Sequence, residues 1–302
     1  MQKLKIAVVG FGNVGRGSVD AVKASPDMEL VGVVLRNKTK IQRVQSVLND
    51  VPVVTDFRQL EKPDVAILAI PSRSVPKVAA QYLNNGISTI DCFDIHGDAI
   101  IELRDDLDII AKQNECVAVI SAGWDPGTDS MIRTILEIVT PRGLTFTNYG
   151  PGMSMGHTVV VKAIDGVEDA ISLTIPQGTG IHRRLVYVKI KDGFDFDKIA
   201  EAVKKDPYFV NDETHVVKVE DIKSLIDVGH GVHMERKGVA GITHNQIIEF
   251  TMSVTNPAAT GQIMASAARA AKKQAPGCYS LPEIPPIDFI HGDKRNLLKK
   301  LI

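Results

Sequence analysis

The sequence predicts an α/β protein: a Rossmann-type doubly wound parallel sheet, joined to a second α+β domain with a mostly antiparallel sheet. Three observations predict this fold. An apolar strand at residues 6–9 runs directly into the glycine-rich turn Gly10-Phe11-Gly12-Asn13-Val14-Gly15. Strand-like and helix-like segments then alternate up to residue 121. After about residue 140, the segments become β-branched or alternating, as is typical of antiparallel strands.

In the first part of the chain, buried strands alternate with amphipathic helices. The expected strands are residues 3–9, 30–35, 65–70, 88–91 and 117–121, and the expected helices are 14–24, 74–84, 98–114 and 131–139. In a doubly wound sheet, ligands gather at the carboxyl ends of the strands. We therefore expect four loops to meet in one crevice: residues 10–15, 71–72, 91–94 and 122–126.

The second part of the chain, after about residue 140, has a different pattern of predicted strands and helices. We expect strands at residues 144–149, 169–175, 184–191 and 213–219, and helices at 196–205 and 257–273. The last of these helices should have Asn256 as its N-cap, Pro257 as its first residue and an Ala-rich, closely packed interior. The tail from Cys278 is broken by prolines and ends in a short basic segment, which we expect to be helical.

Composition bounds the class of protein. A chain of 302 residues with 44% hydrophobic and 24% charged residues suits a two-domain globular enzyme. Its formal net charge of −1 gives no general attraction to nucleic acid or anionic membranes. The N-terminus leads straight into a core strand, and no apolar stretch approaches membrane-spanning length. Three scattered cysteines favour neither a disulfide framework nor a zinc site, so we expect a reducing cytoplasm.

The glycine-rich turn predicts a dinucleotide site. Its first glycines let the backbone turn tightly beside a pyrophosphate, and the third lets helix and strand pack closely. The alternative is a similar turn in another α/β protein. The next strand ends in Leu35-Arg36-Asn37-Lys38 and offers no acid for ribose hydroxyls. A guanidinium suits a 2′-phosphate, so we expect NADP(H), although these cations would also fit a solvated loop.

Four phrases together resemble one family. They are the glycine turn with Arg36, Asp91-Cys92-Phe93-Asp94-Ile95-His96, Ser121-Ala122-Gly123-Trp124-Asp125-Pro126-Gly127 and Gly150-Pro151-Gly152-Met153-Ser154-Met155-Gly156-His157. Nearly the whole chain is similar to the meso-diaminopimelate dehydrogenases. This resemblance implies NADP-dependent oxidative deamination of the D-centre of meso-2,6-diaminopimelate (DAP) to L-2-amino-6-oxopimelate and ammonium. The reverse reaction serves lysine biosynthesis.

The resemblance also implies how the parts are used. Residues 1–122, completed by about 257–302, form the dinucleotide-binding domain, and residues 123–256 form the substrate-binding and dimerisation domain of a homodimer. The cofactor contacts come from the glycine turn and from the ends of the following strands. They are Gly10, Phe11, Gly12, Asn13, Val14, Gly15, Leu35, Arg36, Asn37, Ala69, Ile70, Pro71, Ser72, Cys92, Phe93, Asp94, Ala122, Gly123, Trp124, Asp125 and Pro126.

Two carboxylates at adjacent strand ends, Asp94 and Asp125, can hold an ammonium and move its protons. The resemblance assigns both to the D-centre amine. By pattern alone, Asp125 could equally be a helix N-cap followed by Pro126. The single tryptophan, Trp124, is either a core ring or a cover over substrate or nicotinamide; its glycine-flanked loop favours the latter.

The remaining substrate contacts come from the second domain. Gly150–Gly156 offers backbone N–H groups suited to a carboxylate, and the resemblance places Tyr149, Met155 and Gly156 in that pocket. For the distal L-centre it points to Thr174, Arg184, His230 and Asn256. Arg183 competes with Arg184 for the distal carboxylate. His230 and His233 lack the further ligands of a metal site, so we expect no metal.

Two other functions keep the same fold. One is another NAD(P)-dependent reductase of the aspartate/lysine pathway, such as a dihydrodipicolinate-reductase-like enzyme. Its basic His-His-Lys cluster is missing here. The other is a non-catalytic NADP(H)-sensing regulator, which fold alone does not exclude. The presence of Asp94, Trp124, Asp125 and Arg184 at the expected cleft favours the enzyme.

Overall fold

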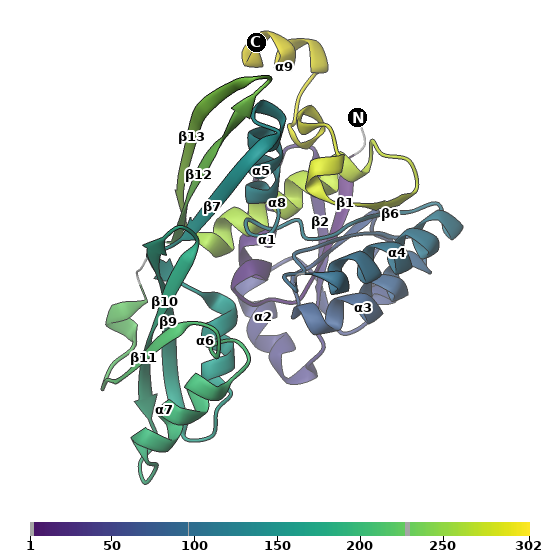
Figure 1. Cartoon of the computed structure of the whole chain (residues 1–302). Coiled ribbons are helices and arrows are strands. Elements are labelled where there is room, and N and C mark those ends of the chain that lie inside the picture. Colours follow the sequence, from purple (N-terminus) through teal and green to yellow (C-terminus); the bar gives the residue numbers. More distant parts are fainter. Residues whose placement is uncertain (1–2, 96, 227–229) are drawn as a thin grey trace. The chain divides into compact units, whose positions relative to one another are not determined.

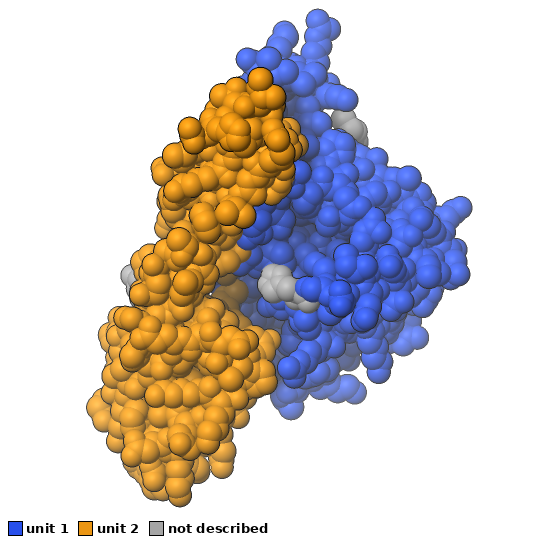
Figure 2. Space-filling model, viewed as in Figure 1, with its two compact units in different colours: residues 1–134, 257–302 blue, residues 135–256 orange. Residues whose placement is uncertain are grey.

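The computed structural model describes residues 3–95, 97–226 and 230–302. The chain divides into two compact units, Met1–Thr134 with Pro257–Ile302, and Ile135–Asn256 (Figure 2). The boundary lies inside helix α5 (Thr128–Val139), later than the expected residue 122. The loop before this helix explains the difference, because Ala122 N–H donates to the carbonyl of Asp91 and Trp124 N–H donates to Thr260 Oγ1. Both bonds hold the loop to the first unit.

The first unit contains a seven-stranded sheet in the order β14-β6-β5-β4-β1-β2-β3 (Figure 1). Its strands are β1 (Leu4–Val9), β2 (Met28–Val34), β3 (Val53–Val54), β4 (Val65–Leu68), β5 (Ser88–Asp91), β6 (Val117–Val119) and β14 (Gly277–Tyr279). Every neighbouring pair is parallel, as predicted. The strand order reverses between β1 and β4, which is where ligands bind in such sheets.

Helices cover both faces of this sheet, which confirms the doubly wound prediction. They are α1 (Asn13–Ala24), α2 (Ile41–Leu48), α3 (Val75–Leu83), α4 (Asp98–Gln113) and α8 (Asn256–Ala271), with α9 (Lys294–Leu301) near the end of the chain. One apolar core joins the sheet to α1, α2 and α8, for example through Val22, Val44 and Ala268. The other joins it to α3 and α4 through Leu83 and Leu107.

Helices α1 and α8 lie almost in backbone contact. A Cβ on Gly17 would lie 2.5 Å from the carbonyl oxygen of Pro257, and one on Gly261 would lie 2.3 Å from the carbonyl carbon of Gly17. The alanines expected to pack closely are buried: Ala265, Ala267, Ala268, Ala270 and Ala271. Small side chains are therefore needed along this helix pair.

The second unit holds two smaller sheets. Its strands are β7 (Arg142–Tyr149), β8 (Gly152–Met153), β9 (Val167–Gly178), β10 (Ile181–Ile190), β11 (Glu213–Lys218), β12 (His230–Ala240) and β13 (Thr243–Val254), and its further helices are α6 (Met155–Lys162) and α7 (Phe196–Lys205). The orders are β11-β10-β9-β8 and β13-β12-β7. All pairs are antiparallel except β10 with β11, so the mostly antiparallel prediction is confirmed.

A buried arginine joins helix α5 to the β7-β12-β13 sheet. Arg236 is 1% exposed and forms a fork with Glu137, at 2.6 Å from Oε1 and 2.8 Å from Oε2. Its Nε also donates to the carbonyl of Thr140 at 2.9 Å. Because every nitrogen of the guanidinium has an acceptor, the charge can lie in the interior.

The long hairpin β12–β13 and the short elements α2, β3 and β14 are absent from the sequence-based expectation. The basic tail is helical, as predicted, in α9. In the part of the chain that the structure describes, no helix combines the length and the apolar character needed to cross a membrane.

Candidate functional site

The glycine turn between β1 and α1 has the geometry of a phosphate-binding turn. Gly10 has φ +93°, and a Cβ there would lie 2.3 Å from the carbonyl oxygen of Ala69. A Cβ on Gly15 would lie 2.3 Å from the carbonyl oxygen of Gly10, so the third glycine allows helix and turn to pack. A Cβ on Gly12 would meet nothing within 4 Å. The middle glycine therefore borders open space, where a pyrophosphate can approach the start of α1.

In the exposed loop after β2, residues 36–40, every charged side chain is a cation. Leu35 is buried, whereas Arg36, Lys38 and Lys40 are exposed. Asn37 Oδ1 accepts the N–H of Thr39 at 2.9 Å and so fixes the loop. Arg36 forms no ion pair with any described residue, which leaves its guanidinium available to an anion.

The loops after β4 and β5 are joined by a pair of hydrogen bonds. Ser72 Oγ donates to Asp94 Oδ1 at 2.5 Å, and the N–H of Asp94 donates to Ser72 Oγ at 3.2 Å. Asp94 is exposed, with its carboxylate oriented by Ser72. Burial raises the pKa of Cys92 to about 12, so this thiol is neutral and is no candidate nucleophile.

The loop after β6 lies beside the β5 loop. A Cβ on Gly123 would lie 3.3 Å from that of Cys92. Helix α5 begins at Thr128, so Gly127 precedes it and Asp125 does not occupy the N-cap position. Asp125 is half-buried, whereas Trp124 is 1% exposed. The burial of Trp124 agrees with the core-ring interpretation, and its contact with substrate stays a prediction.

In the second unit, the structure brings Thr174 and Arg184 together as register partners on β9 and β10. Arg184 Nη1 donates to Thr174 Oγ1 at 2.5 Å, and Arg184 Nε donates to Asp212 Oδ2 at 2.6 Å. Arg183 points elsewhere and pairs with Glu213 at 3.1 Å. Of the two competing arginines, Arg184 is therefore the one beside Thr174.

Three histidines lie in the electrostatic field of Arg184. Burial and then the Arg184 charge lower the pKa of His157 and of His230 to about 4, and they also lower the pKa of His182. His157 Nε2 lies 2.9 Å from the carbonyl of Tyr208, so Nε2 carries the proton and Nδ1 accepts from Ser154 Oγ at 2.8 Å. The three imidazoles are neutral at pH 7, which leaves Arg184 as the cation of this cluster.

The backbone near Tyr149 is fixed by this same cluster. Tyr149 N–H donates to His182 Nε2 at 2.8 Å, and the two rings lie 5.7 Å apart. Gly150 has φ +92°, and a Cβ there would lie 2.2 Å from the carbonyl oxygen of Thr174. Met155 and Gly156 then begin α6. Tyr149, the start of α6 and Thr174 are thus parts of one local structure.

The expected site residues fall into two sets. Asp94, Trp124 and Asp125 belong to the first unit with all the expected cofactor residues, and the other expected substrate residues belong to the second. Asn256, the last residue of the second unit, begins α8, one residue earlier than predicted. His96 and Gly229, which flank expected site residues, lie outside the described residues.

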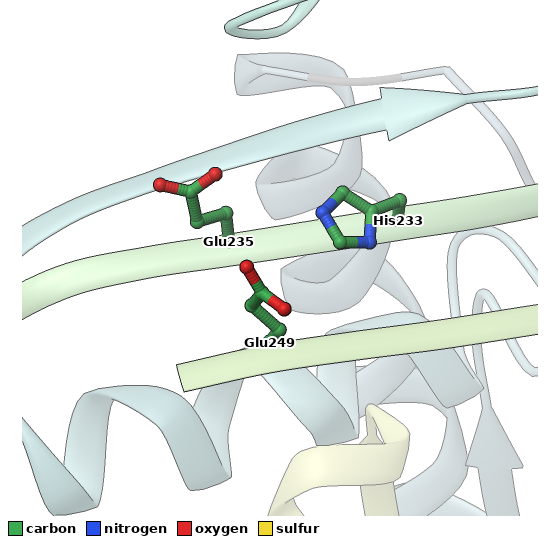
Figure 3. A group of neighbouring side chains, drawn as sticks. All are labelled: His233, Glu235 and Glu249. Atoms are coloured by element: carbon green, nitrogen blue, oxygen red, sulfur yellow. The ribbon is translucent and has the colours of Figure 1, made fainter. Parts of the chain in front are cut away.

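A group of metal-ligand type lies on the β12–β13 hairpin (Figure 3). One ligand atom from each of His233, Glu235 and Glu249 lies within 4.8 Å of the others. Lys237 Nζ lies 3.0 Å from Glu235 Oε1 and balances part of this negative charge. The expectation of a metal-free site stays a prediction.

The chain is similar to known proteins along its whole length. Residues 4–91 match the oxidoreductase family with an NAD-binding Rossmann fold, and residues 123–183 match the diaminopimelic acid dehydrogenase C-terminal domain. A meso-diaminopimelate D-dehydrogenase of Bacteroides fragilis is 52% identical over 302 residues, which cover 100% of both chains. The chain belongs to the meso-diaminopimelate dehydrogenase family.

Two solved structures of similar proteins span the same length. A C. glutamicum DAP dehydrogenase in complex with DAP matches with a TM-score of 0.88 and 26% identity, covering 100% of each chain. An engineered D-amino acid dehydrogenase bound to NADP+ matches with a TM-score of 0.84 and 25% identity, also over 100% of each. Membership of the family confirms the predicted fold class and the predicted enzyme class, an amino-acid dehydrogenase.

Sequence reasoning missed several residues of these clusters. Asp212 and His182 both contact candidate substrate residues, and Asp91 lies buried between two of the candidate loops. The hydrogen-bond partner of each residue lies far along the chain or is a backbone group, so no local sequence pattern predicts the role of the residue. Asp91 opens the phrase that contains Asp94, but nothing in that phrase indicates its role.

Proposed function

We propose that the protein oxidatively deaminates the D-centre of meso-2,6-diaminopimelate to L-2-amino-6-oxopimelate and ammonium, with NADP+ as hydride acceptor. The observation that carries this proposal is the 52% identity to a meso-diaminopimelate D-dehydrogenase across both full chains. The reaction is reversible, and its reductive direction makes the diamino acid from the oxo acid and ammonium.

The cofactor proposal rests on the turn and on the strand end beside it. Open space at Gly12 fits a pyrophosphate, and the exposed Arg36 fits a 2′-phosphate. An NADP+-bound neighbour of the same fold supports the same choice. When bound, the nicotinamide supplies the acceptor for the hydride that leaves the D-centre carbon.

We assign the chemistry at the amine to Asp94 and Asp125. The two carboxylates hold the substrate ammonium, and one of them takes the proton that the amine loses as its Cα–H bond breaks. Ser72 holds Asp94 in place through its 2.5 Å hydrogen bond. Water then adds to the resulting iminium carbon, and ammonia leaves as the carbonyl forms.

The distal L-centre is assigned to the second unit. Arg184 Nε donates a hydrogen bond to Asp212, and Nη1 donates one to Thr174. Its Nη2 has no hydrogen-bond partner among the described residues. A substrate carboxylate would bind there and at the Thr174 hydroxyl. Neutral histidines around this guanidinium add polar contacts without adding a competing charge.

We further propose that the protein is a homodimer joined through its second unit and that it works in the cytoplasm. Large apolar side chains are exposed on α5 and on the β7-β12-β13 sheet: Ile135, Ile138, Val139, Leu144 and Ile247. A group of this kind is typical of an interface. The three cysteines form no disulfide, which suits a reducing compartment.

The test measures NADP+ binding and substrate-dependent NADP+ reduction on the same protein. We expect meso-diaminopimelate to drive reduction of NADP+, followed by the absorbance of the reduced nicotinamide, with NAD+ a much poorer acceptor. The double variant Asp94→Ala, Asp125→Ala should still bind NADP+ but show no turnover. NADP+ binding without any substrate-dependent reduction in the parent protein would instead favour the regulator.

A further inference from the structure

A third acid, Asp91, lies between the two loops that carry Asp94 and Asp125. It is the last residue of β5 and is 0% exposed. Its Oδ1 accepts the backbone N–H of Phe93 at 2.9 Å and the backbone N–H of Ser121 at 3.1 Å. One oxygen atom therefore binds the backbone of both loops, immediately before the segments that hold the two acids.

Ser121 sits in a disfavoured conformation at the same point. Its φ is +52°, in the left-handed region that residues with a Cβ rarely adopt. Its Oγ donates to the carbonyl of Phe93 at 2.8 Å, and the next residue, Ala122, donates its N–H to the carbonyl of Asp91 at 2.7 Å. The strained turn is thus held by bonds to the β5 loop, and Asp91 supplies two of the acceptors.

The other carboxyl oxygen of Asp91, Oδ2, makes no hydrogen bond that the structure describes. Asp91 Oδ2 is buried and has no hydrogen-bond partner within the described residues. Burial raises the pKa of Asp91 to about 6, against the opposing effect of the two N–H groups. A buried, half-satisfied carboxyl is costly to the fold. The presence of Asp91 is explained by its other oxygen, Oδ1, which joins the two loops.

We propose that Asp91 is a positioning residue, which ties the β5 and β6 loops together and thereby fixes the separation of Asp94 and Asp125 at the substrate amine. Asp91 itself touches no substrate. This inference rests on the proposed function, because it concerns the spacing of the two acids that the function needs. Small displacements of catalytic groups reduce rates steeply, so a loosened loop should lower kcat more than cofactor binding.

The experiment compares Asp91→Ala, Asp91→Asn and a matched control. Asp91→Ala removes the shared acceptor, whereas Asp91→Asn keeps an oxygen at Oδ1. The control is Thr89→Val, two residues earlier on β5, where the hydroxyl is also buried and has no hydrogen-bond partner among the residues that the structure describes. For each protein we would measure kcat and KM for meso-diaminopimelate, the Kd of NADP+, and amide hydrogen exchange at Phe93 and Ser121.

We expect Asp91→Ala to lower kcat about 100-fold and to speed exchange at both amides, with the NADP+ Kd changed by less than about threefold. Asp91→Asn should recover kcat to within about fivefold of the parent, and Thr89→Val should match the parent. Should Asp91→Ala fail to fold, Asp91→Ser is the second variant, because its hydroxyl fills part of the buried space but is too short to accept both backbone N–H groups. It should lower kcat about tenfold in a folded protein.

Three outcomes overturn the proposal. One is parental kcat in Asp91→Ala or, if that variant does not fold, in Asp91→Ser. The second is an equal loss of kcat and NADP+ affinity that Asp91→Asn does not recover, which marks a merely structural residue. The third is a parent protein that does not oxidise meso-diaminopimelate, which removes the proposed function as well. An active parent with an unaffected Asp91→Ala variant removes only the positioning role.

Discussion

At the end of β2, the chain carries a guanidinium where an NAD-binding protein would carry an acid. Arg36 is exposed, and Asn37 beside it is held by its bond to Thr39. A cation at this point attracts a 2′-phosphate and gains nothing from a free ribose hydroxyl. We therefore expect cofactor choice to depend on a single side chain, Arg36, whose removal should leave the fold intact.

Arg36→Ala tests this at the scale of one residue. We expect the variant to bind NADP+ at least about tenfold more weakly, as expected for the loss of a charge-assisted bond of about 1.5–3 kcal/mol. NAD+ affinity should stay at its parental value. Isothermal titration with both dinucleotides is the measurement, and Lys40→Ala is the matched control. An equal loss for both dinucleotides contradicts the assignment.

At the scale of elements, the three glycines of the β1–α1 turn have different reasons for lacking a side chain. Gly10 and Gly15 face backbone atoms at 2.3 Å, so a Cβ at either position would force the turn apart. Gly12 faces open space and has φ −81°, which any residue accepts. Gly10 and Gly15 are thus needed by the fold, whereas we expect Gly12 to be needed only when the cofactor binds.

Gly12→Ala and Gly15→Ala should therefore behave differently. Gly12→Ala should unfold at the parental midpoint but bind NADP+ about tenfold or more weakly, because its methyl enters the space of the pyrophosphate. Gly15→Ala should lose on the order of 1–3 kcal/mol of stability through overpacking. Thermal unfolding with and without NADP+ separates the two effects. Parental NADP+ affinity in Gly12→Ala would place the phosphates elsewhere.

The sequence predicts a strand or helix where a local residue pattern marks it. Strand β5 and helix α7 have the expected bounds, because the β-branched Thr89 and Ile90 mark the strand and a clear amphipathic face marks the helix. The hairpin β12–β13 was missed because charged residues such as Glu235, Lys237 and Glu249 line its outer face. Its strand character comes from pairing over a long stretch, which a local reading does not detect.

The candidate site divides in the same way. Gly10, Arg36 and Asp94 belong to short sequence motifs, and the neighbouring residues in each motif predict the role of the residue. The partners Ser72 and Asp94 are 22 residues apart, and Arg184 and Asp212 are 28 apart. Such pairs depend on the sheet order, so no local pattern could predict Asp212 or the role of Asp91.

At the scale of the whole molecule, the buried His230 and the half-buried His157 should make stability depend on pH. The folded protein holds His157 and His230 neutral, with pKa values near 4, whereas the unfolded chain takes up protons near pH 6.5. Between these values the unfolded state binds more protons. Stability is therefore complete above about pH 6.5 and falls as the pH drops toward 4.

We expect the free energy of unfolding to fall between pH 7 and pH 4.5, with each of these histidines contributing up to about 3 kcal/mol once the pH is below both pKa values. His157→Gln should reduce the slope by close to one proton, since glutamine does not titrate. Denaturant unfolding at a series of pH values gives the slope. An unchanged slope in the variant would show that His157 is not the group concerned.

The chain order of the first unit has a consequence for the newborn protein. Strand β14 completes a sheet whose other six strands precede residue 120, and helix α8 packs in the core of that sheet. The ribosome makes both elements only after residues 135–255. Until then, Gly17 lacks its close contact with Gly261, and Val19 and Val22 lack the α8 alanines that share their apolar core. A nascent chain of this protein therefore carries an unfinished nucleotide domain for nearly half of its synthesis, and a product truncated before Pro257 exposes an apolar face to chaperones and proteases.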